Sequence, residues 1–96
     1  MTGKDDLDRF IASQQGRFTE ELRELCAIAC EATDRAALDA AARWCRDRLR
    51  AAGFADAREL RTDRAPALVV GETGSGKRTL VGVHHYDVQP AVPLDL

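Results

Sequence analysis

A histidine and an aspartate stand two residues apart in the segment 83–90, whose sequence is VHHYDVQP. An imidazole can bind a divalent metal through one ring nitrogen while a carboxylate accepts a hydrogen bond from the other, which sets the tautomer and raises the basicity of the ligand. Residues i and i+2 of a strand point to the same face, so His85 and Asp87 can be neighbours if a strand runs that far. Because this spacing is common, the pair by itself is a weak signal for a metal site.

Two helices are expected before this motif. Apolar residues recur with a period of about 3.6 positions from residue 7 to residue 29, which predicts one long amphipathic helix or two shorter ones. A second apolar stripe covers residues 38–52, where Thr33 or Asp34 can cap the start and Gly53 can end the helix.

The pattern after Gly53 changes to short extended pieces. Residues 57–60, 67–71 and 79–85 are expected to form strands, separated by a polar segment and a Gly-rich turn. Two helices followed by about three strands are typical of the beginning of an α/β layered domain. A chain of 96 residues makes one domain at most, so residues 1–96 are treated as part of a single domain.

Composition excludes several classes of function. Apolar residues make up 45% and charged residues 31% of the chain, as in soluble globular proteins, and no apolar stretch approaches the ~20 residues of a membrane span. The net charge is −2, and the arginines are spread among acidic residues along the helices instead of forming a basic block, which predicts no nucleic-acid partner. The first ten residues lack the apolar region of a secretory signal, so a cytoplasmic location is expected.

The three cysteines, Cys26, Cys30 and Cys45, are expected to be small buried hydrophobic residues. Their number is odd and no Cys-x-x-Cys pair occurs, which argues against a disulfide framework.

The Gly-rich turn supports an alternative function. Gly71–Lys77, GETGSGK, matches the first seven positions of a phosphate-binding P-loop, so a nucleotide-binding module is the second hypothesis. A P-loop needs Ser or Thr directly after the Lys, whereas Arg78 stands there, and it needs a helix to follow. A flexible hairpin connection between two strands is the simpler interpretation.

The residues around the histidine motif carry a more specific signal. Residues 79–90, TLVGVHHYDVQP, followed by PLDL at residues 93–96, resemble the first metal-site motif of the co-catalytic zinc aminoacylase/carboxypeptidase superfamily of metallopeptidases. The similarity is greatest to its dipeptidase, or carnosinase-like, branch. The family usually has Gly where this chain has His84, which adds bulk and a second imidazole beside the expected ligand.

The resemblance implies a zinc-dependent hydrolase with a three-layer α/β/α catalytic domain. It assigns metal binding to His85 and the active-site role of orienting that ligand to Asp87. It further implies two Zn²⁺ ions per site in the complete enzyme, with other divalent metals as substitutes, a small peptide or N-acyl amino acid as substrate, and a homodimer.

One ligand does not make a catalytic zinc site, because such sites use about three protein ligands. We therefore expect the chain to be an N-terminal fragment of the hydrolase, truncated after the first metal-site motif and inactive alone. The acidic pair Glu20-Glu21 is expected to lie on a solvated helix face instead of serving catalysis. A non-catalytic interaction remnant, in which His85 is only a polar residue at a strand end, is the third hypothesis.

Overall fold

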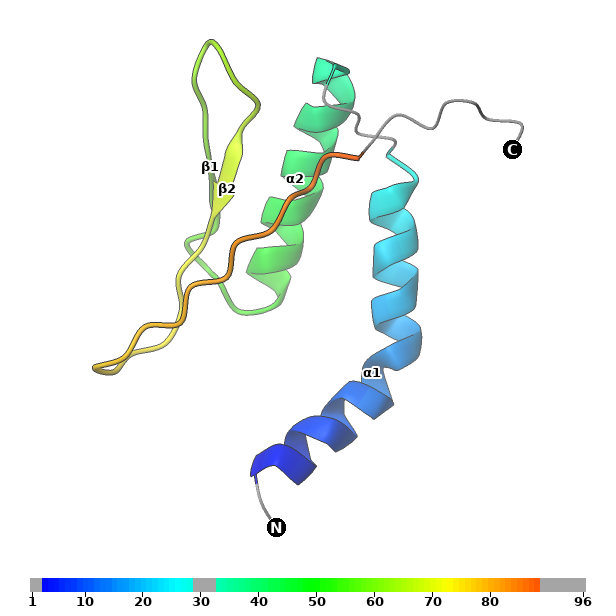
Figure 1. Ribbon diagram of the computed structural model, residues 1–96, viewed down its shortest axis with the longest axis vertical. Coiled ribbons are helices and arrows are strands. Elements are labelled where there is room, and N and C mark those ends of the chain that lie inside the picture. Colours follow the sequence, from blue (N-terminus) through cyan, green and yellow to red (C-terminus); the bar gives the residue numbers. More distant parts are fainter. Residues whose placement is uncertain (1–2, 29–32, 89–96) are drawn as a thin grey trace.

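The computed structural model describes residues 3–28 and 33–88 of the chain. It contains helix α1 (Gly3–Cys26), helix α2 (Arg35–Ala51), strand β1 (Arg58–Leu60) and strand β2 (Leu68–Val70) (Figure 1). The expected order of two helices followed by strands is confirmed, and the described part is a small mixed α/β unit. Within it, no helix combines the length and apolar character needed to cross a membrane.

Helix α2 carries most of the small core. Its N-terminus is capped by Asp34, whose side chain accepts a hydrogen bond of 3.0 Å from the backbone N–H of Ala37, as the sequence predicted. Leu38, Ala41 and Ala42 follow at helical spacing and are buried. A helix with one apolar stripe is stabilised chiefly by packing that stripe against other elements, and here the strands provide the packing surface.

The two strands form an antiparallel hairpin beside α2. Their register pairs Arg58 with Val70 and Leu60 with Leu68, and Figure 1 shows the hairpin lying alongside the helix. Ala57 and Ala67 are both buried, one directly before each strand. Small side chains at these positions allow the hairpin backbone to approach α2 closely.

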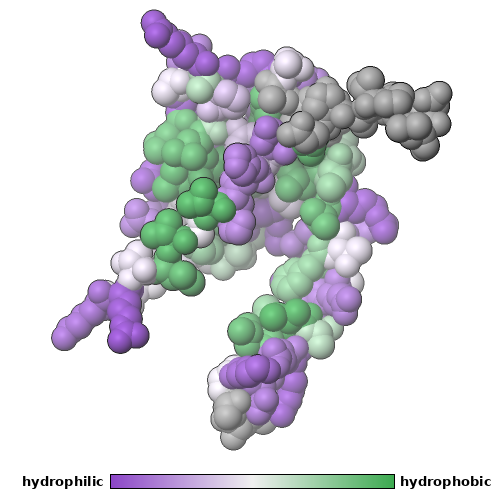
Figure 2. Space-filling view, in the orientation of Figure 1, coloured by the Kyte–Doolittle hydropathy of each residue, from purple (hydrophilic) through white to green (hydrophobic). Residues whose placement is uncertain are grey.

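Helix α1 is one continuous helix and contains no buried residue. Its apolar stripe remains exposed, with Leu7 at 56%, Phe10 at 52% and Leu22 at 60% of the full side-chain accessibility. Figure 1 shows that its N-terminal half extends beyond the end of α2, and Figure 2 shows apolar surface along it. The predicted amphipathic pattern is therefore present, but in the described part of the chain only its C-terminal end is covered, where Leu25 and Ile28 pack against the α2 core.

The C-terminal half of α1 is tied to α2 by polar contacts. Arg48 of α2 lies 2.6 Å from the Glu21 carboxylate, and the Trp44 indole N–H donates to Glu24 at 3.3 Å. The expectation that Glu20-Glu21 is a solvated pair holds for Glu20 and is wrong for Glu21, whose side chain is only 23% exposed. A basic residue on the neighbouring helix, which sequence periodicity does not reveal, accounts for this difference.

The expected strand at residues 79–85 is absent. This segment has no regular secondary structure, and the side chains of Leu80, Val81 and Val83 are 98%, 74% and 85% exposed. β-branched residues favour strands because they pack against neighbours on a sheet, and strand propensity has little effect without a paired neighbour. In the described residues, α2 packs on a two-stranded sheet. The three-layer α/β/α architecture that the resemblance implies is therefore not seen in this part of the chain.

Ion pairs join α2 to strand β1 and to Arg61, the residue after it. The Glu59 side chain, only 9% exposed, accepts hydrogen bonds from Arg46 at 2.8 Å and from Arg61 at 2.5 Å. Arg61 also donates to Asp39 at 3.0 Å, and this hydrogen bond holds the pKa of Asp39 below its usual value of 3.8. One carboxylate on β1 therefore fixes two arginines between the helix and the hairpin.

Replacing Glu59 by Gln should destabilise the chain by about 1 kcal/mol, because one carboxylate oxygen becomes an NH₂ donor and loses its arginine hydrogen bond, while the other bond loses its charge assistance. Urea unfolding followed by circular dichroism measures the change. Asp47→Asn is the matched control, because Asp47 also contacts Arg46 but is 63% exposed, and it should cost almost nothing. Equal effects of the two substitutions would contradict the role given to Glu59.

Candidate metal site

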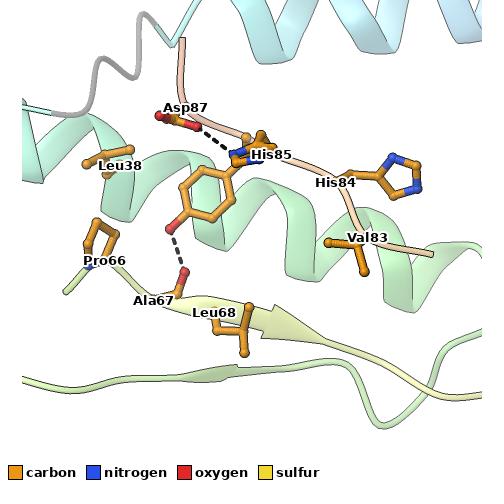
Figure 3. Close-up of a pocket in the computed structure, with 9 residues that line it drawn as sticks. Leu38, Pro66, Ala67, Leu68, Val83, His84, His85 and Asp87 are labelled. Carbon is orange, nitrogen blue, oxygen red and sulfur yellow. Dashed lines mark hydrogen bonds and ion pairs between the residues drawn. The ribbon is translucent and has the colours of Figure 1, made fainter. Parts of the chain in front are cut away.

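The motif segment runs past α2 and β2 and forms one wall of an open cavity of about 330 Å³ (Figure 3). The other walls are Leu38 from α2, Pro66 and Ala67 from the hairpin turn, and Leu68 from β2. These neighbours are apolar, so the histidine motif borders a hydrophobic surface on one side and solvent on the other.

Tyr86 attaches the motif to this surface. Its ring packs against the core cluster formed by Leu38 and Ala41, and its hydroxyl donates a hydrogen bond of 2.6 Å to the backbone oxygen of Ala67 (Figure 3). Ala67 is 3% exposed, so the bond satisfies a carbonyl in a buried residue. Tyr86 was not predicted to have a role, although an aromatic residue between His85 and Asp87 was a signal in the sequence.

His85 and Asp87 lie next to each other on the solvent side. The Nδ1 atom of His85 is 3.4 Å from Oδ1 of Asp87, and the two side chains are 93% and 41% exposed. The predicted proximity is therefore present, although the chain reaches it without forming a strand. With Nδ1 turned to the carboxylate, Nε2 is the ring nitrogen left to bind a metal, as in histidine ligands supported by a second residue.

His84 does not join this pair. Figure 3 shows its ring directed along the chain away from Asp87, and its Nε2 atom lies 3.2 Å from where a Cβ on Gly82 would be. The absence of a side chain at Gly82 leaves room for this ring position. The second imidazole, which the sequence suggested as a competing ligand, is therefore placed apart from His85.

The described residues supply one zinc ligand, His85, and not the set of ligands that a complete zinc site needs. Across residues 3–28 and 33–88, no three His, Cys, Asp or Glu side chains are grouped so that they could hold a metal ion. Neither described cysteine adds a ligand to the pair. The expected burial of the cysteines is wrong for Cys26, which is exposed; Cys45 is half-buried, and Cys30 lies outside the described residues. Cys26 is exposed because no element covers that face of α1 in the described part of the chain.

The Gly-rich loop lacks the geometry of a phosphate site. Gly74 and Gly76 have positive φ values of 84° and 139°, and the described residues after Lys77 form no helix. Two anchors hold the loop to the turn after α2, since the Glu72 N–H donates to Asp56 and the Thr73 hydroxyl donates to the Gly53 oxygen. The helix N-terminus on which a P-loop depends is absent from this part of the chain.

Comparison with known proteins adds no relative. No family model, no curated protein and no solved structure matches this chain. The case for a metal site therefore depends on the motif residues and their geometry.

The environment of Tyr86 predicts a specific dependence of stability on pH. Burial raises the pKa of the Tyr86 phenol above its usual value of 10.0, and the negative charge of Asp39 adds to this shift. The unfolded chain therefore loses the phenolic proton at a lower pH than the folded chain. The contribution of protonated Tyr86 to the free energy of unfolding is complete below about pH 10 and is lost as the pH rises through the folded-state pKa. Because the chain has a single tyrosine, its ultraviolet absorbance measures this titration directly. An identical midpoint in the folded and denatured chain would contradict the burial of the phenol.

Proposed function

We propose that this chain is the N-terminal part of a zinc-dependent dipeptidase or related amidohydrolase, with His85 as a zinc ligand and Asp87 as the active-site residue that orients it. The observation that carries the proposal is the 3.4 Å approach of His85 Nδ1 to Asp87 Oδ1, with the imidazole otherwise open to solvent. The motif sequence of residues 79–90 and the PLDL segment at 93–96 add specificity to that geometry.

The chemical role of each side chain follows from the pair. In a zinc-bound site Asp87 would accept the Nδ1–H of His85, which would hold the ring in the tautomer whose Nε2 lone pair is available. Nε2 would then bind Zn²⁺, and a bound zinc in this class of site polarises a carbonyl and lowers the pKa of a water molecule. The cavity next to the pair offers an apolar wall to a substrate, which is compatible with a small peptide or an N-acyl amino acid.

The proposal requires further residues. A catalytic zinc takes about three protein ligands, and His85 supplies one. A second metal, a bridging carboxylate and a general-base Glu would belong to other parts of a complete enzyme, as would the remaining layers of an α/β/α domain and a dimer interface. The 96 residues by themselves should therefore show no hydrolysis.

The experiment that tests the proposal begins with the coding DNA downstream of codon 96, read in all three frames. We expect a continuation that encodes an acidic bridging residue, a Glu-Glu pair and a later His. The longer protein should hydrolyse dipeptides or N-acyl amino acids, lose activity when a chelator removes the metal, and regain it with Zn²⁺. A stop codon followed by none of these residues would overturn the proposal.

One observation favours a second candidate, a non-catalytic interaction segment. The apolar side chains of α1 from Leu7 to Leu22 are exposed, and uncovered apolar surface of this kind often marks a protein contact. Under this alternative, His85→Ala changes neither zinc binding by the chain nor turnover by a longer protein that contains it. The two candidates therefore differ in the outcome of one substitution.

A further inference from the structure

We infer that Tyr86 is the positioning residue of the candidate metal site, and that its attachment to α2 and the hairpin holds His85 and Asp87 together on the solvent side. This inference rests on the proposed function for its metal-binding consequence. The anchoring itself rests only on the contacts of residues 79–87.

Besides Tyr86, the segment is restrained only at its end, where Val88 forms an isolated β-bridge in the described residues. Residues 79–87 form no regular hydrogen-bonded structure, and every side chain among them except Tyr86 is exposed. Leu80 is 98% exposed and His85 is 93% exposed at its side chain, so neither packs to any extent. Within these residues Tyr86 alone is partly buried and joined to the rest of the fold by a long-range hydrogen bond.

The anchor reaches two separate elements. The ring packs against the core around Leu38, which belongs to the capped helix α2. The hydroxyl binds the oxygen of Ala67, directly before β2, at 2.6 Å. A ring held by a helix on one side and by a hairpin at its tip has few remaining orientations.

The position of Tyr86 between the two functional side chains explains why the anchor matters. In extended backbone, successive side chains point to opposite faces. With the Tyr86 side chain fixed inward, His85 and Asp87 both point outward and come within 3.4 Å of each other. A hydrogen bond on the buried face thereby sets the distance between ligand and carboxylate on the exposed face.

Tyr86→Phe tests this inference because it keeps the ring and removes the hydroxyl. Nuclear magnetic resonance of the metal-free chain should show increased backbone mobility at residues 85–87 and a weaker preference for the Nδ1–H tautomer of His85. Titration with ZnCl₂, followed through the His85 ring signals, should show affinity lowered by about tenfold, the size of effect typical when the support of a ligand is lost. Circular dichroism should show the helices retained.

Thr73→Val is the matched control. It removes a hydroxyl that also donates to a backbone oxygen, that of Gly53, in a loop away from the pair, and it should leave the His85 tautomer and the zinc affinity unchanged. If Tyr86→Phe alters neither the mobility of residues 85–87 nor the zinc affinity, or if Thr73→Val has the same effect, the inference is overturned.

Two further measurements separate the possible failures. In the unsubstituted chain, backbone order should be higher at residues 85–87 than at residues 80–83, and equal mobility would refute the anchor even if Tyr86→Phe did not fold. If the unsubstituted chain binds no zinc at His85, the proposed function fails, and the metal-free mobility and tautomer data still decide whether Tyr86 positions the pair.

Discussion

His85→Ala should weaken the binding of Zn²⁺ to this chain by at least about tenfold, since it removes the one imidazole that a carboxylate supports. His85 Nδ1 lies 3.4 Å from Asp87, which leaves Nε2 free to bind the metal. Isothermal titration with ZnCl₂, together with the chemical shifts of the two histidine rings, measures the affinity and identifies the ligand.

His84→Ala is the matched control for this prediction. It removes an equivalent imidazole from the adjacent position, and because that ring lies apart from Asp87 the zinc affinity should change by less than about twofold. Asp87→Asn should lower the affinity by about tenfold while leaving His85 in place. Equal losses for His84→Ala and His85→Ala would show that the carboxylate makes no difference and would contradict the assignment.

The largest effect on stability is expected for Leu38→Ala. Leu38 is 2% exposed and is the one large side chain that is almost fully buried in the described residues. Its truncation should cost about 2–5 kcal/mol through lost burial and the cavity left behind. With so small a core we expect a total stability of only a few kcal/mol, so the variant should be largely unfolded at room temperature.

Thermal and urea unfolding followed by circular dichroism test this prediction. Leu7→Ala makes the same chemical change on α1, where Leu7 is 56% exposed, and it should change stability by no more than about 0.5 kcal/mol. The fluorescence of Trp44, the single tryptophan, reports separately on the α1–α2 contact because its indole binds Glu24. A cooperative transition at an unchanged denaturant concentration in Leu38→Ala would show that the core lies elsewhere.

Local sequence was sufficient for the helices and the two strands, whereas the hairpin connection expected at Gly71–Lys77 was wrong because residues 79–85 form no strand. The periodic apolar positions of α1 and α2, the Asp34 cap and the Gly53 end are local features whose energies depend on residues within one turn. The two short strands were also predicted to within about two residues at each end. Each of these elements needs only a neighbour nearby in the chain, so its sequence signal is reliable.

Residues whose surroundings come from distant parts of the chain could not be predicted in the same way. The segment 79–85 has the composition of a strand but lacks a paired neighbour in the described residues, so its apolar side chains remain exposed. Glu21 was expected to be solvated and instead binds Arg48 of the next helix. Whether a strand finds a partner and whether a side chain is covered depend on contacts between distant parts of the chain, which the periodicity of the sequence does not encode.

In the candidate site, too, some properties follow from the local sequence and others from tertiary contacts. The sequence by itself determined the residue types and the two-residue spacing that make His85 and Asp87 a possible ligand and support, because those properties are covalent. The tertiary structure decided that their side chains meet at 3.4 Å, that His84 lies apart, and that Tyr86 turns inward to bind the Ala67 oxygen. These arrangements depend on where α2 and the hairpin place a hydrophobic surface and a buried carbonyl, and only folding brings those groups to the motif.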